Sequence, residues 1–174
     1  LNIYDYTDYC PNGLQVEGKE QVQTIAFAVS ATQYSINKAI ELKADMLIVH
    51  HGLFWKFHGT RTITGAFAKR VRPLIENNIN LVGYHLPLDA HLESGNAKGI
   101  ADKIDLVDLK PFGDYKGMPT GVRGKLKNPC TVMELTQKLE TTLNHKVILS
   151  TFDENSKIET LGIITGGANS DWIQ

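Results

Sequence analysis

The stretch Asp45-Met46-Leu47-Ile48-Val49-His50-His51-Gly52 decides how the fold of this chain is interpreted, because a short apolar run ends there in two histidines and a glycine. A second run of the same design follows at Asn80-Leu81-Val82-Gly83-Tyr84-His85-Leu86-Pro87-Leu88-Asp89-Ala90-His91. Both runs have the length and composition of buried strands. Each ends in side chains that bind metals, so the simplest interpretation is one shared metal site.

The segments around these two runs predict alternating strands and helices. In chain order the expected elements are strand 23–30, helix 32–43, strand 46–49, helix 64–77, strand 81–84 and helix 94–103. Residues 23–30 are apolar at nearly every position, which predicts a strand buried on both faces. The alternation indicates parallel βαβ units flanked by helices, so the predicted fold class is α/β.

The topology brings the two polar clusters together. Ligands bind outside the carboxyl ends of the strands in a parallel α/β sheet, and consecutive strands are usually near neighbours. We therefore predict that His50, His51 and Asp89 are metal ligands at a common edge of the sheet. His85 and His91 are candidates to orient a ligand from behind, and the alternative is that they are surface residues near the site.

The spacing of the histidines bears on the number of ions. Adjacent histidines on an extended chain point to opposite sides, so they bind one ion together only if the backbone turns between them. Otherwise each faces a different ion of a close pair, an arrangement that activates a shared water. The pattern favours two divalent ions, and the ligand types suit zinc, iron, manganese or nickel. The remaining ligands must come from His85, His91, another chain or residues beyond Gln174.

Residues 105–120 are rich in Pro, Gly and Asp, which predicts an exposed connection between two lobes. The first lobe is then 1–104 and carries most of the metal site, and the second is 121–174, with an apparent truncation at its C-terminus. For the second lobe we predict a strand at 121–126, a helix opened by the capping box Thr131-Val132-Met133-Glu134, and strands at 146–151 and 161–165.

Composition excludes several classes of protein. The net charge of −1 gives no support to nucleic-acid or anionic-membrane binding. No apolar run approaches the roughly 18 residues that cross a bilayer. Cys10 and Cys130 are too few and too separated for a disulfide framework, and two reduced thiols fit a cytoplasmic protein. Cys10 and Asn12 are assigned to turn structure, and Gln15 is expected to be exposed.

Three motifs resemble those of the Nif-three-like family, also called dinuclear metal centre proteins or GTP cyclohydrolase I type 2 homologues. The motifs are Pro11-Asn12-Gly13-Leu14-Gln15-Val16, Val49-His50-His51-Gly52-Leu53-Phe54-Trp55 and the stretch from Gly83 to His91, and Gly166-Gly167-Ala168 resembles the family's late glycine turn. The resemblance implies an α/β fold of two similar lobes, a dinuclear metal site and a ring-shaped hexamer. His50, His51 and Asp89 match family metal ligands.

The resemblance also implies ligands that this sequence does not contain. The family uses a His-x-x-x-Glu motif near its C-terminus, and the sequence ends at Gln174 before any such motif. We therefore expect either a piece of a longer protein or a truncated site.

Two functional hypotheses follow. The first is a cytoplasmic metal-dependent hydrolase acting on GTP or a related nucleotide or cyclic amide, in which a hydroxide that bridges the metals is the nucleophile. The second is a non-enzymatic protein that binds or delivers metal, or a ring-shaped scaffold for protein partners. A small-molecule substrate is not identified, and DNA or RNA binding has little support from the net charge.

Overall fold

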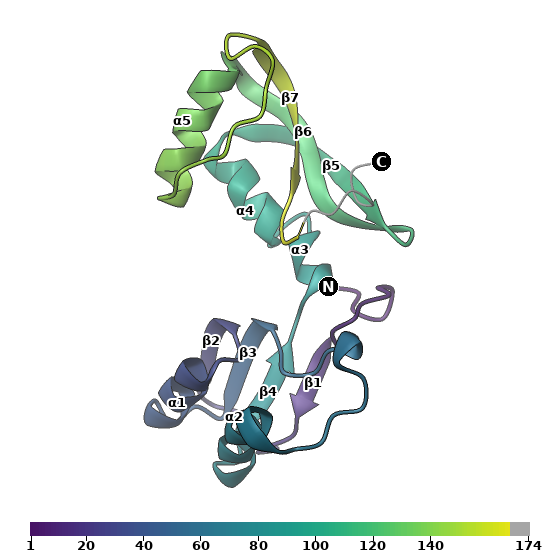
Figure 1. Cartoon of the computed structure of the whole chain (residues 1–174), viewed down its shortest axis with the longest axis vertical. Helices are drawn as coiled ribbons and strands as arrows, with labels where there is room; N and C mark the ends of the chain where they lie inside the picture. The colour runs from purple at the N-terminus through teal and green to yellow at the C-terminus, as the bar shows by residue number, and fades with distance from the viewer. Residues whose placement is uncertain (168–174) are drawn as a thin grey trace. The chain divides into compact units, whose positions relative to one another are not determined.

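The computed structural model describes residues 1–167 of the chain, which divides into two compact units, Leu1–Leu86 and Pro87–Gln174. Each unit has a sheet of its own (Figure 1). Each also has a hydrophobic core of its own. The architecture is mixed α/β, which confirms the predicted fold class.

The first unit is built on a four-stranded sheet with the order β1-β4-β3-β2. Its strands are β1 (Gly13–Val16), β2 (Ile25–Ser30), β3 (Met46–His51) and β4 (Asn80–Gly83). As predicted, β2, β3 and β4 are parallel, whereas β1 pairs antiparallel with β4 and was too short to be predicted. The interior strand β3 continues through both His50 and His51, so the two histidines end a strand with a neighbour on each side.

Helices α1 (Gln33–Glu41) and α2 (Gly65–Glu76) cover one face of this sheet (Figure 1). Thr32 caps α1 in a capping box with Ser35, which satisfies backbone donors at the start of the helix. The buried apolar side chains of the helices and the sheet form one cluster: Ile36, Ala39, Leu47, Val49, Phe67, Val71, Leu74 and Leu81. This packing holds β3 and β4 in the register that positions their ends.

The prediction that residues 23–30 are buried on both faces is wrong. Burial alternates along β2, and Ile25, Phe27 and Val29 are 45%, 75% and 71% exposed. The strand lies at the edge of the sheet, and α1 and α2 cover only the opposite face. The apolar composition of residues 23–30 therefore reflects burial on one face of the strand, not on both.

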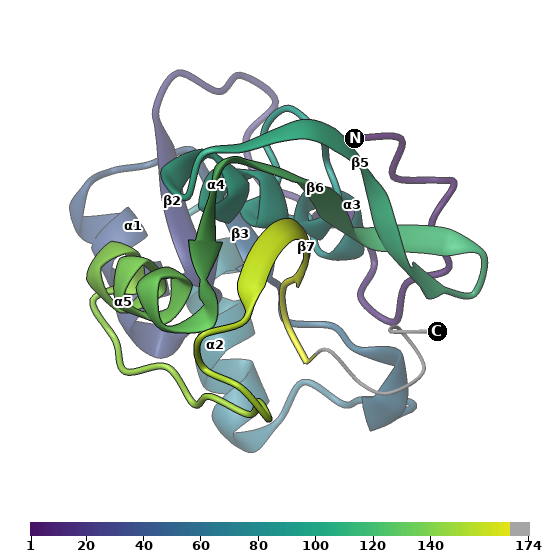
Figure 2. The same ribbon diagram turned by 90° about the horizontal axis from the view of Figure 1, so that it is seen from above.

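The second unit contains a three-stranded antiparallel sheet with the order β5-β6-β7, which can be followed in Figures 1 and 2. Its elements are α3 (Leu86–Asp89), α4 (Asn96–Lys103), β5 (Leu106–Tyr115), β6 (Met118–Thr131), α5 (Val132–Leu143) and β7 (Lys157–Ile164). The capping box predicted at Thr131 and Glu134 is present. The resemblance implied two similar lobes, and within residues 1–167 the two sheets differ in topology.

The predicted connection at 105–120 is wrong, because these residues form β5, a tight turn and the start of β6. Lys116 and Gly117 have φ values of 56° and 83°, as the two central residues of a hairpin turn require. Pro111 lies in β5, an edge strand, where a missing N–H is tolerated. Residues rich in Pro, Gly and Asp thus make a hairpin here. The domain division falls at Leu86 and Pro87 instead.

The strand predicted at 146–151 is also absent, and Ile148 there is 98% exposed. Its residues have strand propensity but no neighbouring strand to pair with. Ala168, the last residue of the predicted glycine turn, lies outside the described residues.

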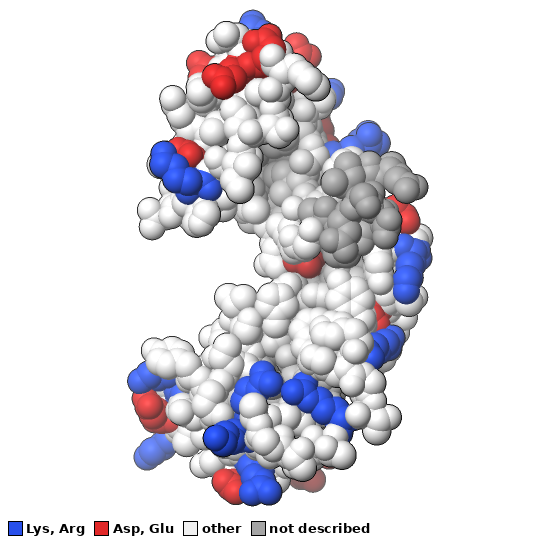
Figure 3. All heavy atoms as spheres, in the orientation of Figure 1, with Lys and Arg blue, Asp and Glu red and all other residues white. Residues whose placement is uncertain are grey.

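None of the helices in residues 1–167 combines the length and the apolar character needed to cross a bilayer. Basic and acidic side chains are interspersed on the face drawn in Figure 3, and no single sign of charge covers it.

Candidate metal centre

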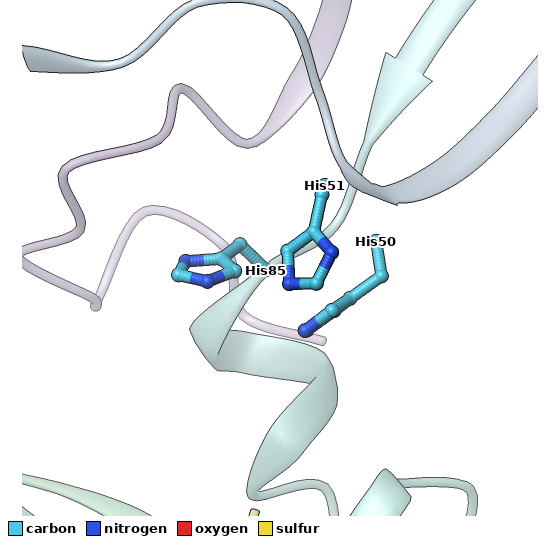
Figure 4. Close-up of side chains that lie close together, drawn as sticks. All are labelled: His50, His51 and His85. Atoms are coloured by element: carbon cyan, nitrogen blue, oxygen red, sulfur yellow. The ribbon is translucent and has the colours of Figure 1, made fainter. Parts of the chain in front are cut away.

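Three histidines converge at the carboxyl edge of the first unit's sheet. His50 and His51 end β3, and His85 follows β4 (Figure 4). Their candidate ligand nitrogens all lie within 4.8 Å of one another, and this is the group of potential metal ligands found within residues 1–167. The ring centroids of His50 are 4.5 Å from His51 and 5.0 Å from His85. The parallel topology therefore brings His50 and His51 together with His85 at the carboxyl edge of the sheet.

The two adjacent histidines are held from opposite sides of β3. His50 Nδ1 lies 2.9 Å from the carbonyl oxygen of Tyr84, which follows β4. His51 Nδ1 lies 2.9 Å from Ser30 Oγ at the end of β2. Each ring is thus fixed by the strand on its own side, and the two rings still meet. The rule that neighbouring strand residues point apart does not prevent a shared site here.

His85 is fixed by a buried carboxylate. Its Nδ1 lies 2.9 Å from Asp8 Oδ1, and Asp8 is only 5% exposed. The same carboxylate accepts hydrogen bonds from the backbone N–H groups of Cys10 and Leu86 and from Asn12 Nδ2, each at 3.0 Å. Burial acts to raise the pKa of Asp8, but the hydrogen bonds from His85 and Cys10 outweigh it and hold that pKa below its ordinary value. Asp8 is therefore an ionised anchor for the His85 ring.

Asp8 was not found from the sequence. Its local signal is an Asp two residues before the Cys10 N–H that it accepts from, which is ordinary turn chemistry. Nothing in the sequence links it to His85, which is 77 residues away.

These hydrogen bonds decide which nitrogen can bind a metal. A backbone carbonyl and an ionised carboxylate only accept, so Nδ1 donates in both His50 and His85 and the lone pair lies on Nε2. A histidine ligand held in this way is the usual arrangement around protein-bound metals. Two nitrogens on one zinc ion are at most about 4.2 Å apart, twice a Zn–N distance of about 2.1 Å. Nitrogens within 4.8 Å of one another need only small ring rotations to reach one ion.

The motif Pro11-Asn12-Gly13-Leu14-Gln15-Val16 contacts the segments that carry the clustered histidines. Gln15 is half-buried, so the expectation of an exposed side chain is wrong. Its Oε1 accepts from the Leu53 N–H at 2.9 Å, and its Nε2 donates to the Pro11 carbonyl at 2.7 Å. A Cβ at Gly52 would lie 2.2 Å from Gln15 Oε1, and one at Gly83 would lie 2.6 Å from Gln15 Nε2. The glycines beside the histidines therefore make room for this amide.

Asn12 has a tertiary contact as well, since its Oδ1 accepts the backbone N–H of His85 at 2.8 Å. Cys10 is buried and accepts a hydrogen bond from Gln15 Nε2 at 3.3 Å. Burial is the main cause that raises the pKa of the Cys10 thiol. Both residues therefore support the loop in which they lie.

The remaining predicted site residues lie in the second unit. Asp89 is 2% exposed, and its Oδ1 accepts hydrogen bonds from Asn96 Nδ2 at 2.7 Å and from Thr165 Oγ1 at 2.9 Å. His91 Nδ1 accepts from the Ser94 N–H at 3.1 Å. Their assignment to the metal site stays a prediction. His85, for which the sequence left open a ligand, an orienting residue or a surface residue, is one of the three clustered histidines.

A strand-end histidine cluster on an α/β sheet, with Nδ1 of each ring engaged by an oxygen, places the chain in the class of α/β proteins whose side chains could hold a metal ion. Within that class the chain belongs to the Duf34/NIF3 (NGG1p interacting factor 3) family, whose sequence profile matches residues 1–174.

Relatives at high identity share a name. The chain is 44% identical over 160 residues to a Haemophilus influenzae protein named GTP cyclohydrolase 1 type 2 homolog, covering 92% of this chain and 63% of the relative. It is 44% identical over 171 residues to a Vibrio cholerae protein of the same name, covering 96% of this chain and 66% of the relative. The chain thus spans slightly less than two thirds of the length of these two relatives.

Solved structures confirm the fold. A structure described as protein ybgI, of unknown function, superposes with a TM-score of 0.83 at 38% identity, covering 96% of this chain and 65% of the other. The protein TTHA1606 from Thermus thermophilus superposes with a TM-score of 0.82 at 34% identity, covering 95% of this chain and 65% of the other.

Proposed function

We propose that this protein is a metal-dependent hydrolase that acts on GTP or a related nucleotide or cyclic amide. The observation that carries the proposal is the convergence of His50, His51 and His85 with their candidate ligand atoms within 4.8 Å. The name of the relatives, GTP cyclohydrolase 1 type 2 homolog, supports the substrate class. The chemistry of the three imidazoles supports zinc, iron or nickel, and a carboxylate ligand such as Asp89 would also suit manganese.

Each residue has a defined part in this proposal. His50, His51 and His85 hold the metal through Nε2, and a divalent ion held there supplies water activation for hydrolysis. Asp8 keeps His85 in the Nδ1–H form and fixes its ring. Tyr84 does the same for His50 through its carbonyl oxygen. The rings of Trp55 and Tyr9 border His85 at 5.0 and 5.4 Å and limit the access of water to that side.

The finer features of the proposal rest on the sequence pattern and on the family resemblance. They are a second ion, Asp89 as a further ligand, assembly into a toroidal homohexamer, and a cytoplasmic location, which the two free cysteines support. Light scattering would give the mass of the assembly, and metal analysis of Asp89→Asn would give its effect on stoichiometry. We expect a mass of six chains and a reduced metal content in the variant.

The test of the activity is metal content and GTP turnover measured on the same preparations. Protein stripped with a chelator and reloaded with zinc, manganese, iron or nickel should regain turnover only when metal is present. His85→Ala should lose both metal and turnover, whereas His145→Ala, an exposed histidine, should keep both. Undiminished turnover by metal-free protein contradicts the proposal. Tight metal binding without turnover on nucleotides and cyclic amides would instead support a metal-delivery or scaffold protein.

A further inference from the structure

Three aromatic side chains lie beside the histidine cluster and have no part in holding the metal. Trp55 meets His85 edge to face at 5.0 Å, and Phe57 stacks on Trp55 at 5.5 Å with an interplanar angle of 26°. Tyr9 lies 6.2 Å from both Trp55 and Phe57. We call Tyr9, Trp55 and Phe57 the aromatic shelf. It continues outward from the ring of His85.

The aromatic shelf is fixed to the same backbone as the histidines. Trp55 Nε1 donates to the Gly52 carbonyl at 3.1 Å, next to His51. The Lys56 N–H donates to the Tyr9 carbonyl at 2.8 Å, and Lys56 Nζ donates to the Asp8 carbonyl at 2.6 Å. The shelf is therefore held in place by contacts to residues that adjoin the cluster.

Core packing does not explain the outer end of the shelf. Phe57 is 68% exposed, although its ring is stacked. Phe67 shows what a core aromatic of this unit looks like, since it is 3% exposed and packs edge to face on Phe54 at 5.4 Å. A stacked aromatic pair with one exposed and one half-buried ring, beside a polar site, is the kind of surface on which a planar ring binds.

We propose that the aromatic shelf binds the planar heterocycle of the substrate, by stacking a purine-type ring against Phe57 and Trp55. This inference rests on the proposed function and adds to it the part of the chain that recognises the base. The clustered histidines then hold the metal at the reacting part of the substrate, and the aromatic shelf contributes binding affinity for the ring. Stacking on aromatic side chains depends on the face of the ring and not on its hydrogen-bonding edge.

The test is calorimetric titration of the zinc-loaded protein with guanosine, which carries the ring without phosphates, and separately with ribose 5-phosphate, which lacks the ring. Phe57→Ala should weaken guanosine binding about 5- to 100-fold and leave ribose 5-phosphate unaffected. Its metal content should stay at the wild-type level. The matched control is Phe152→Ala, which removes a fully exposed phenylalanine from a loop of the second unit and should change nothing.

The outcomes separate this inference from the proposed function. Guanosine that does not bind, or binds equally well to Phe57→Ala, overturns the shelf even if GTP turnover is intact. An equal loss in Phe152→Ala overturns it too. Selective loss of guanosine affinity in Phe57→Ala supports the aromatic shelf. If the wild-type protein then shows no GTP turnover, that result counts against the hydrolase proposal alone.

Discussion

The strand-end cluster and the surface loops of this protein hold their histidines in different ways. Nδ1 of His51, His50 and His85 contacts a partner that is 21, 34 and 77 residues away along the chain. The other three histidines, His58, His91 and His145, contact partners only 3, 3 and 1 residues away. The cluster is therefore oriented by the tertiary fold, and the other three histidines are oriented by residues close to them in the sequence.

This difference indicates that the cluster is preorganised. A ring held by a distant partner keeps its position only while the sheet is folded, and it does not have to be ordered again when a ligand binds. A ring whose hydrogen-bond partner lies in the same turn does not depend on the folded sheet for its position. The predictions below test whether the distant anchors matter, beginning with the largest expected effect.

Removing a clustered histidine should affect metal binding most. We expect His85→Ala to lower zinc affinity by more than about 100-fold, because even the loss of a residue that only orients a ligand costs about 10- to 100-fold. His145→Ala should leave affinity unchanged. Competition with a chromophoric chelator measures both. Equal affinities for the two variants would show that the cluster is not the zinc site.

Removing a distant hydrogen-bond partner of a clustered histidine should have the second-largest effect on zinc affinity. Asp8→Asn keeps the size of the side chain but removes the charge that accepts from His85 Nδ1, so we expect zinc affinity to fall about 10- to 100-fold. Asp153 is the control, because it is exposed and its carboxylate accepts hydrogen bonds from Asn155 and Ser156 of its own turn. If Asp8→Asn bound zinc as tightly as Asp153→Asn, anchoring by the fold would have no role in affinity.

Substitutions at the contact between Gly52 and Gln15 should have a moderate effect on stability. Gly52→Ala places a Cβ against Gln15, whose amide is tied to Leu53 and Pro11 and cannot move without losing those bonds. We expect a loss of about 1–3 kcal/mol in the free energy of unfolding. Gln15→Ala alone should cost about 1–3 kcal/mol through the lost hydrogen bonds.

The double variant distinguishes a clash from two independent defects. Because Gln15→Ala opens the space that the new Cβ needs, the double variant should lose clearly less than the sum of the single losses. Urea unfolding of the four proteins gives this coupling. Strict additivity would mean that Gln15 does not press on Gly52.

The smallest effect on stability is expected at Asp45, which directly precedes β3, the strand that ends in His50 and His51. The hydrogen bond from Lys19 Nζ is the main cause that lowers the pKa of Asp45 to about 2, with the Thr24 and Gln23 N–H groups adding to it. A depressed pKa in the folded state stabilises the fold above the unfolded pKa of about 3.9, and this contribution is lost as pH falls toward 2. Asp45→Asn should therefore lose less stability than wild type between pH 4 and 2.

Urea midpoints measured at several pH values in that range give the comparison. Identical declines in wild type and Asp45→Asn would show that the Lys19–Asp45 contact contributes nothing to acid sensitivity.

The sequence predicted the first unit better than the second, for a physical reason. In a parallel sheet the strands alternate with helices and end at one edge, so the position of His50 and His51 could be inferred from local patterns. The antiparallel sheet of the second unit lacks that alternation. Its hairpin turn at Lys116 and Gly117 has the same composition as a linker, and 105–120 was accordingly misassigned.

The residues that support the site were harder to predict than the site itself. Metal-binding side chains are recognisable by type and by position after a strand. Asp8 and Gln15 act through contacts with residues 77 and 38 positions away, and no local pattern encodes such distances. The interpretation of Gln15 as exposed followed from its place beside a turn. Only the folded chain shows that Gly52 and Gly83 lie against its amide.

The most direct test of the central claim is ¹⁵N NMR of the imidazoles during zinc titration. His50 and His85 should already be in the Nδ1–H form without metal, and zinc should shift the Nε2 resonances of His50, His51 and His85 while those of His58 and His145 stay unchanged. Zinc that shifts only the surface histidines, or His50 and His85 found in the Nε2–H form, would contradict the account.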